Sequence, residues 1–361
     1  MPLARIAFGV AALIVLGVGA RILLVDDPMG GRPVAEIDVT GTRNVNAIAD
    51  NVATTPGTAT IIADPEAPVV SDGITIVGDD VPDGTPQDPL GTASADGLFP
   101  ELLEATEDGS IPRISASGQR PFDAYARPSL TPAAAGGKKL IAIVVTGLGL
   151  NATGTATAID SLPETVTLAF APYGNDVART VASARAEGHE VLLEVPLEPF
   201  DYPESDPGPD TLLTGQAPRD NLQKLFTVMA KFGGYVGLIN HMGARFTAST
   251  ADFAPFMEEL GSRGLGYLDD GSSNRSVAEQ LAAANGVEFA RAAMALDTNP
   301  SRAAILDQLK ALEARAAESG SAIAVISALP ISVQTLSEWA ESVEEQGFAI
   351  VPVSALMKAS S

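Results

Sequence analysis

Apolar and polar residues follow two different periods over the C-terminal two thirds of the chain. From Lys138 onward, short apolar runs alternate with longer stretches in which apolar residues recur at helical spacing. Several of these helical stretches end at a glycine, the usual C-terminal stop signal. The apolar runs predict strands at residues 140–145, 166–170, 190–195, 235–240, 264–269, 289–294, 323–327 and 349–353.

Strands that alternate with helices in this way indicate right-handed βα units and a largely parallel sheet. Seven or eight such units over residues 138–357 predict an α/β fold, a (β/α) barrel of seven to eight strands, in preference to an open doubly wound sheet. The glycines at 147 and 149 follow a strand but lack the third glycine of a dinucleotide-binding loop. A nucleotide cofactor is therefore not expected.

The first 27 residues have the pattern of an export signal. Arg5 precedes the apolar run 6–20, and the chain then becomes acidic at Asp26 and Asp27. If the run continues through Val25, it reaches roughly the 20 residues that span a bilayer. We expect a periplasmic or outward-facing protein, with a cleaved signal peptide (secreted) and a signal-anchor helix (attached to the inner membrane) as open alternatives.

The next segment differs from the C-terminal part in composition. Residues 28–110 are rich in Pro, Gly and Asp and poor in large apolar side chains, so burial cannot offset the entropy lost on ordering. They are predicted to be a disordered linker. Residues 111–137 contain Ile, Phe and Tyr and are predicted to form an extended docking arm on the folded domain.

Charge and cysteine content narrow the possible partners. The formal net charge of -23 argues against nucleic acid and anionic membrane surfaces, so contact with a membrane is expected only through the N-terminal segment. The chain has no cysteine, which excludes disulfides and Cys-ligated zinc.

Candidate chemistry gathers where predicted strands begin or end. The only two histidines, His189 and His241, lie there, as do Asp269 and Asp270. Imidazoles and carboxylates at strand ends are the usual groups of βα-type active sites. We take His189, Asp269 and Asp270 as catalytic candidates, although His189 could instead form a structural hydrogen bond and the aspartates a strand-to-helix cap.

A proline-rich loop, residues 200–209, follows the third predicted strand. Aromatic faces stack on sugar rings and acidic side chains accept sugar hydroxyls, so the loop is typical of a carbohydrate-facing surface, with a rigid lid that binds nothing as the alternative. The substrate-binding candidates are Phe200, Asp201, Tyr202, Asp206, Asn240 and Arg245.

Several ordered motifs carry a family resemblance. They are GLGLN (147–151), VTLAFAPYG (166–174), GHEVLLEVPLEPFDYPESDPGP (188–209), YVGLINHMGARFTA (235–248), YLDDGSS (267–273) and FAIVPVSAL (348–356). With these motifs the chain resembles the divergent polysaccharide deacetylase family, a branch of the carbohydrate deacetylase β/α barrels. The resemblance implies a metal-dependent hydrolase, zinc being the family's metal, that acts on acetyl groups of envelope glycans at the C-terminal rim of the barrel.

The same resemblance identifies what is missing. The family's first strand typically ends in two adjacent aspartates, one a metal ligand and one the base, and a further metal-binding histidine follows the penultimate strand. Here those positions are Thr146, Gly147 and Ser327, which leaves His241 as the remaining metal ligand. A catalytic zinc usually has three protein ligands, so the site is degenerate unless Glu194, the Asp269–Asp270 pair or Asp297 substitutes.

Whether the protein is an enzyme stays open at this point. We expect an exported polysaccharide-deacetylase-like domain linked to cell-envelope carbohydrate metabolism, with weakened or lost hydrolase activity and either no cofactor or a weakly bound divalent metal. The expected ligand is an envelope glycan or peptidoglycan fragment. The alternative is a catalytically silent scaffold that binds a glycan or another envelope protein.

Overall fold

The computed structural model describes residues 90–130 and 135–359, which belong to one compact unit, Gly78–Ser361. The predicted export signal at residues 1–27 and the linker up to residue 89 lie outside the described residues. Within the described ranges, no helix is both long and apolar enough to cross a membrane.

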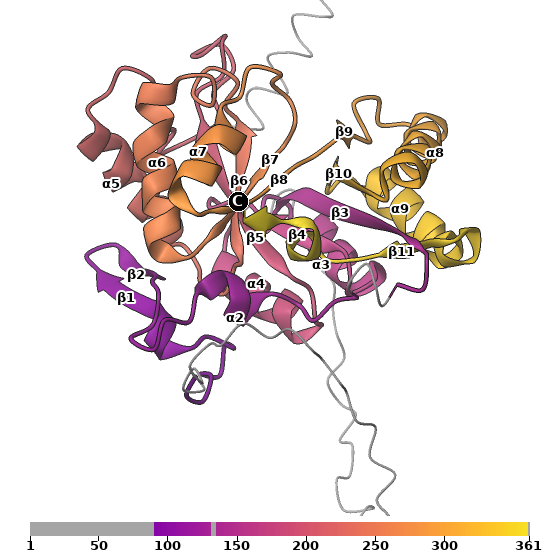
Figure 1. Cartoon of the computed structure of the whole chain (residues 1–361), viewed down its shortest axis with the longest axis horizontal. Coiled ribbons are helices and arrows are strands. Elements are labelled where there is room, and N and C mark those ends of the chain that lie inside the picture. Colours follow the sequence, from indigo (N-terminus) through magenta and orange to yellow (C-terminus); the bar gives the residue numbers. More distant parts are fainter. Residues whose placement is uncertain (1–89, 131–134, 360–361) are drawn as a thin grey trace, which may run out of the picture. The chain divides into compact units, whose positions relative to one another are not determined.

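A curled, mostly parallel sheet forms the centre of this unit (Figure 1). Its strands run in the order β12-β8-β7-β6-β5-β4-β3-β10-β9, and β11 pairs with the first residues of β3. Their bounds are β3 Lys139–Leu148, β4 Thr167–Phe170, β5 Val191–Leu197, β6 Gly237–Met242, β7 Gly266–Asp269, β8 Glu288–Arg291, β9 Met294–Ala295, β10 Ser321–Ser327, β11 Phe348–Ile350 and β12 Lys358–Ala359. The prediction of an α/β fold with a largely parallel sheet is confirmed, whereas in place of the predicted barrel of seven to eight strands the described residues form a curled half-barrel sheet of ten strands.

One predicted strand, 289–294, is in fact two. β8 pairs with β7, and β9, which follows after Ala292 and Ala293, pairs with β10. The backbone N–H of Ala292 donates to Asp269 of β7, whereas that of Ala293 donates to Ile323 of β10. This short segment therefore contacts both ends of the curled sheet.

The two faces of the strands form two separate cores. Alternate side chains of a strand point to opposite faces. In β3, Ile141 and Ile143 belong to the core between sheet and helices, whereas Leu140 and Ala142 belong to the core on the sheet's inner face. Both faces are covered, which explains why the strands read as nearly continuous apolar runs.

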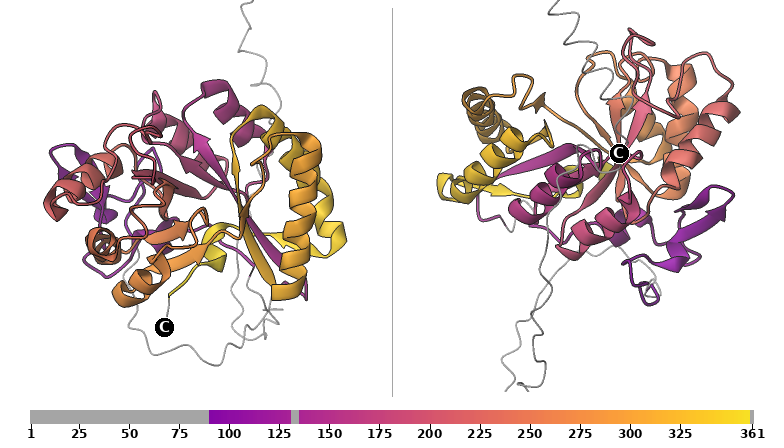
Figure 2. Two further views of the ribbon diagram at one scale, coloured as in Figure 1. Left: turned by 90° about the horizontal axis from the view of Figure 1, so that it is seen from above. Right: turned by 180° about the vertical axis from the view of Figure 1, so that it is seen from behind.

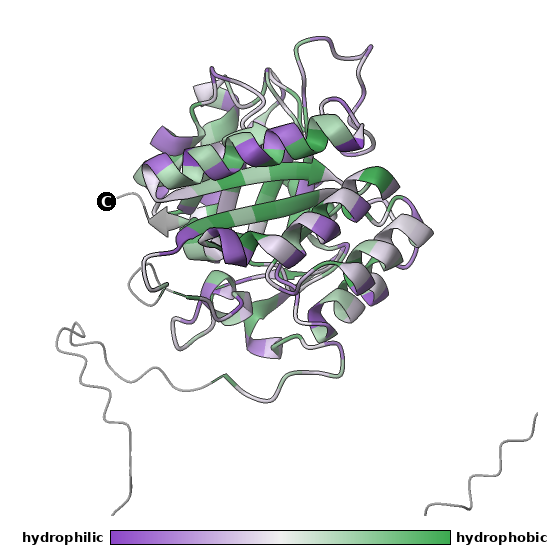
Figure 3. Ribbon diagram, turned by 90° about the vertical axis from the view of Figure 1, so that its right-hand side faces the viewer, coloured by the Kyte–Doolittle hydropathy of each residue, from purple (hydrophilic) through white to green (hydrophobic). Residues whose placement is uncertain are grey.

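Helices follow most of the strands and turn their polar faces outward (Figure 3). Their bounds are α3 Ala152–Ser161, α4 Val177–Ala186, α5 Pro218–Met229, α6 Thr250–Arg263, α7 Ala278–Asn285, α8 Arg302–Ser319 and α9 Pro330–Val343. The short elements are η1 Pro100–Leu102, α2 Pro121–Tyr125, η2 Glu344–Gln346 and η3 Val353–Leu356. Most strand-to-helix loops therefore lie at the C-terminal edge of the sheet, where the candidate site is.

The region expected to be linker up to residue 110 is partly ordered, so that boundary is wrong. β1 (Leu103–Thr106) and β2 (Gly109–Pro112) form an antiparallel hairpin, and β2 lies beside α5 (Figure 2). The few large apolar side chains of this stretch are concentrated where they can be buried, as Leu102 and Ile111 are. Further along, Phe122 and Tyr125 of α2 pack into the inner core, so the predicted docking arm is helical at this point.

Candidate functional site

The C-terminal ends of neighbouring parallel strands meet at one edge of the sheet and bring the candidate residues together. β3, β5, β6 and β7 supply Gly147, Glu194, His241 and the Asp269–Asp270 pair, respectively. Glu194 pairs with Ile239 in the register of β5 and β6, two residues before His241. The predicted rim is therefore present, with Glu194 at its centre.

Glu194 is the most perturbed acidic group of this rim. Its side chain is buried, and its Oε1 accepts a hydrogen bond from the backbone N–H of Gly147. Burial raises the pKa of Glu194 to about 7, although the Gly147 hydrogen bond acts in the opposite direction. Near neutral pH this carboxyl therefore exists in both protonation states, as an acid–base group requires.

His241 lies beside this carboxyl. Its Nδ1 is 4.0 Å from Oε2 of Glu194, and its side chain is 43% exposed, so the imidazole faces both the carboxyl and solvent. Burial lowers the pKa of His241 while the nearby charge of Asp270 opposes that shift. Burial also raises the pKa of Asp270, whose Oδ1 accepts hydrogen bonds from the N–H and hydroxyl of Ser272.

A small cavity of about 140 Å³ opens onto Glu194 and His241. Its walls are mainly apolar, and the remaining lining residues are Leu150, Ala171, Pro172, Tyr173, Pro196 and Pro207. Ligand pockets usually measure roughly 300–1,000 Å³. This one can therefore hold only a single functional group of a larger ligand.

The C-terminal end of the proline-rich loop (residues 200–209) closes one side of the cavity. Tyr173 donates its hydroxyl hydrogen bond to the carbonyl of Pro209. Gly208, at φ +118, lies so close that a Cβ there would be 2.9 Å from the Tyr173 ring. Pro207 is thereby held against the cavity, and the phenol of Tyr173 is occupied within the protein.

The predicted substrate-binding residues of this loop lie on its outer part. Phe200 is 53% exposed, and the guanidinium of Arg275 lies 5.5 Å from its ring centroid. Asp201 accepts a hydrogen bond from Ser205, and Asp206 accepts one from the N–H of Gly208. These two carboxylates stabilise turns of the loop itself.

Tyr202, Asn240 and Arg245 complete the predicted substrate-binding set. Tyr202 is half-buried and precedes a cis proline. Both polar atoms of the Asn240 amide form hydrogen bonds, since its Oδ1 accepts from the Tyr267 hydroxyl and the N–H of Asp270 while its Nδ2 donates to the carbonyl of Met242. Arg245 forms an ion pair with the buried Glu198 at 3.1 Å.

Of the three catalytic candidates, His189 is not brought to the rim. It precedes the start of β5, at the opposite end of the strand from Glu194, and is 3% exposed. Its two ring nitrogens lie 2.9 Å and 3.2 Å from the carbonyls of Val166 and Ile159. This is the structural role that the sequence had left open.

Asp269 lies at the rim but is turned inward. Its Oδ1 accepts the N–H of Gly271, as an aspartate in a turn does. Its Oδ2 is buried with no hydrogen-bond partner among residues 90–130 and 135–359.

The residues at the family's metal positions do not fit a metal. Thr146 Oγ1 donates to the carbonyl of Ile326 at 3.3 Å, and the N–H of Ser327 donates to Asp297 at 3.0 Å. Asp297 also accepts the Ser332 hydroxyl at 2.6 Å, so it joins β10 to α9 and is not a free ligand. In the part of the chain that the structure describes, no three His, Asp or Glu side chains form a group that could hold a metal ion.

The profile of the divergent polysaccharide deacetylase family matches residues 143–357. The chain belongs to that family.

Several relatives are similar to part of the chain. A crystal structure of an uncharacterized protein from Agrobacterium tumefaciens is 43% identical, with a TM-score of 0.65, over 69% of this chain and 99% of that one. The uncharacterized protein YibQ of Escherichia coli is 25% identical over 56% of this chain. That match spans only 60% of YibQ. An uncharacterized protein of Haemophilus influenzae is 26% identical over 54% of this chain and 69% of its own length.

Sequence reasoning missed much of the cavity. It considered Glu194 only as a substitute metal ligand and overlooked Tyr173, Pro207 and Leu150. Two signals in the sequence could have indicated these residues. One is the Pro-Tyr-Gly sequence (172–174) shortly after the strand that ends at Phe170, and the other is the apolar Leu150 after Gly149.

Proposed function

We propose that the protein binds an acetylated glycan of the cell envelope at this rim and that its metal-dependent hydrolase activity is weakened or lost. The proposal rests on one observation, the 140 Å³ cavity that Glu194 and His241 line together. Family membership supports the substrate class. The ligand is therefore a glycan or a peptidoglycan fragment that carries an acetyl group.

The chemistry of the cavity suits an acetamido group. Such a group has one apolar methyl, one N–H donor and one carbonyl acceptor. Pro172 and Pro196 offer apolar wall, and the Glu194 carboxyl can accept the N–H. His241 supplies a ring nitrogen at the mouth, where it can donate to the carbonyl in the tautomer that carries hydrogen there.

The expected weakness of hydrolysis follows from the donor set. Neutral hydroxyls such as those of Thr146 and Ser327 are poor zinc ligands, and one imidazole is fewer than the three donors that a catalytic zinc usually has. Thr146 and Gly147 also stand where the family has its metal-binding aspartate and its carboxylate base, and loss of general-base catalysis typically costs about 10² to 10⁴ in rate.

The test uses the full chain with its metal content and acetate release measured together. We expect binding of N-acetylglucosamine oligomers, zinc well below one per chain and acetate release at background. His241→Ala should weaken binding, whereas His189→Gln, a change far from the rim, should not. Stoichiometric tight zinc together with turnover of acetylated sugar would contradict the proposal.

A second candidate function, a scaffold that binds an envelope protein, has its own supporting observation. Leu150, Phe200, Met242 and Leu329 are exposed apolar side chains, and all four lie at strand ends or in the loops that follow them. Exposed apolar residues that gather on one edge are typical of interaction surfaces. If no acetylated sugar binds while Phe200→Ser abolishes capture of an envelope protein, this candidate replaces the first.

We also propose that the protein is exported, either anchored in the inner membrane or secreted. Support comes from Arg5, the apolar run 6–20 and the acidic exit at Asp26 and Asp27. A reporter fused after Asp50 should be active outside the cytoplasm. Activity of that fusion in the cytoplasm would refute export.

A further inference from the structure

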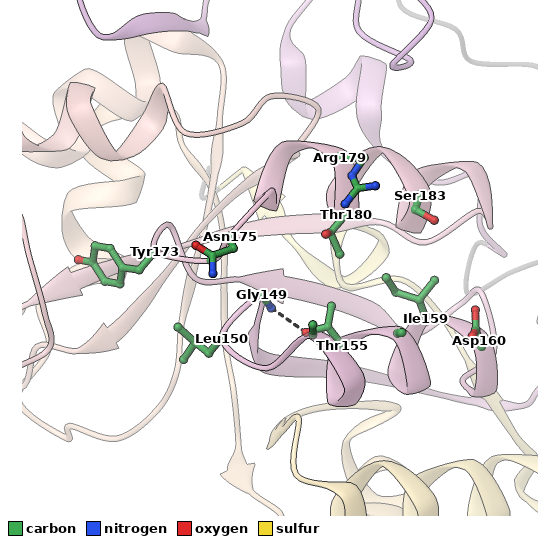
Figure 4. Close-up of a pocket in the computed structure, with 13 residues that line it drawn as sticks. Gly149, Leu150, Thr155, Ile159, Asp160, Tyr173, Asn175, Arg179, Thr180 and Ser183 are labelled. Carbon is green, nitrogen blue, oxygen red and sulfur yellow. Dashed lines mark hydrogen bonds between the residues drawn. The ribbon is translucent and has the colours of Figure 1, made fainter. Parts of the chain in front are cut away.

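A second and larger hollow lies between α3 and α4, with a volume of about 400 Å³ (Figure 4). Thr155 and Ile159 come from α3 on one side, and Thr180 and Ser183 come from α4 on the other. Ala156, which has a small side chain, also lines the hollow on the α3 side. The volume falls within the roughly 300–1,000 Å³ of ordinary ligand pockets, which the Glu194 cavity does not reach.

The hollow adjoins the Glu194 cavity. Leu150 and Tyr173 line both spaces, and Leu150 is 62% exposed. The backbones of Gly149 and Gly174 are in close contact, since a Cβ at Gly174 would lie 2.4 Å from the carbonyl oxygen of Gly149. A ligand that enters the small cavity with one group can therefore extend into the hollow across the exposed surface of Leu150.

Polar groups that lack internal partners line the hollow. Asn175 and Ser183 are exposed, and their side chains form no hydrogen bond to another described residue. Asp160 and Arg179 bring one charge of each sign, and Arg179 already faces Asp176 at 3.0 Å. Amide, hydroxyl and balanced charges over an apolar floor match the hydroxyl-bearing edges and apolar faces of sugars, and they offer no net charge to select an anion.

We propose that this hollow binds the sugar units that adjoin the acetylated unit held at Glu194, so that the protein recognises a stretch of glycan chain and not a lone sugar. This inference rests on the proposed function, because it places the neighbouring sugar units of the same glycan whose acetylated unit is held at Glu194. Because the Glu194 cavity can hold only one functional group, the rest of the ligand must lie outside it. The hollow is the neighbouring space, which shares Leu150 and Tyr173 with that cavity.

The test compares N-acetylglucosamine oligomers of increasing length on the full chain. Affinity is measured by calorimetry, and by ligand-observed NMR for the monomer. The key variant is Ala156→Trp, which fills the hollow from its α3 wall. Thr157→Trp is the matched control, because Thr157 is exposed on the same helix but does not line the hollow. Ser183→Trp repeats the block from α4, in case Ala156→Trp fails to fold.

We expect wild type to bind the trimer about tenfold or more tightly than the monomer. Either blocking variant should bind the trimer no more tightly than the monomer, with its affinity for the monomer unchanged from wild type. The control Thr157→Trp should bind both ligands as wild type does. If trimer and monomer bind equally, or if the blocking variants bind the trimer as wild type does, this inference fails while the proposed function stands. If wild type binds no oligomer of any length, the proposed function fails and this inference fails with it.

Discussion

Replacing Glu194 by glutamine should make the protein more stable at alkaline pH. The carboxyl is 3% exposed, and its pKa is raised from 4.5 to about 7 by burial. Below pH 4.5 both the folded and the unfolded chain carry the proton on this group. Between pH 4.5 and about 7 the folded chain holds more protons than the unfolded chain, so stability falls as pH rises. Above that window both states are ionised and the full penalty is present.

The size of the effect follows from the same two values. One pKa unit corresponds to about 1.36 kcal/mol, so the difference between 4.5 and about 7 amounts to about 3 kcal/mol of lost unfolding free energy by pH 8. Glutamine cannot ionise, and its side-chain oxygen can still accept the Gly147 N–H. The variant should therefore match wild type near pH 4.5 and exceed it at pH 8.

The assay is urea denaturation of both proteins at pH 5, 6, 7 and 8. Glu318→Gln, an exposed change with the same effect on net charge, is the control. Both comparisons are repeated in a His241→Gln background, because the lowered pKa of His241 makes stability rise with pH up to about its unfolded value. If Glu194→Gln destabilises the protein at pH 8, the carboxylate is stabilised as an anion. A cation would then be bound at the site, and the reasoning above would be refuted.

Three further changes test the rim. Gly174→Ala should lower stability by about 1–3 kcal/mol in thermal melts, because its Cβ would lie 2.4 Å from the Gly149 carbonyl oxygen; an unchanged Tm would show that the two loops separate easily. Met242→Asn should raise the unfolding free energy by up to about 1 kcal/mol, because Met242 has φ 58 and asparagine tolerates this region better; a loss of stability would mean that Met242 packing outweighs strain. Thr146→Asp, Gly147→Asp and Ser327→His together should raise zinc affinity in calorimetric titration, and an affinity equal to wild type would show that the strand ends lack the required geometry.

The sequence could predict the sheet well because burial on both faces leaves a strong local signal. All eight predicted apolar runs contain strands, from residues 140–145 to 349–353. The signal fails where a strand changes partner, as at Ala292 and Ala293, since pairing with two different neighbours leaves no mark on composition. It fails also for the hairpin before residue 112, where a few buried side chains suffice to order an otherwise polar stretch.

The sequence could predict only those site residues whose position follows from the strands. His241 lies in β6 and Glu194 in β5, and the parallel pairing of these two strands brings them together. For His189 the sequence left a catalytic and a structural role open, because a histidine next to a strand is informative only when the end of the strand is known, and His189 lies before the start of β5. Tyr173 and Pro207 depend on how the loop after β5 folds back, which no local pattern specifies.

The residues that replace the family's metal and base positions are each satisfied within the protein. The N–H of Gly147 binds the Glu194 carboxyl, and Ser327 donates to Asp297, which also holds Ser332. A buried polar group left without a partner costs about 1–3 kcal/mol, and among the described residues Oδ2 of Asp269 is such an atom on this rim. Here the substituted positions are hydrogen-bonded, and the cavity at Glu194 and His241 remains open. The hydrogen bonds made by Thr146, Gly147 and Ser327 leave the cavity accessible, and this is the arrangement that the proposed binding site requires.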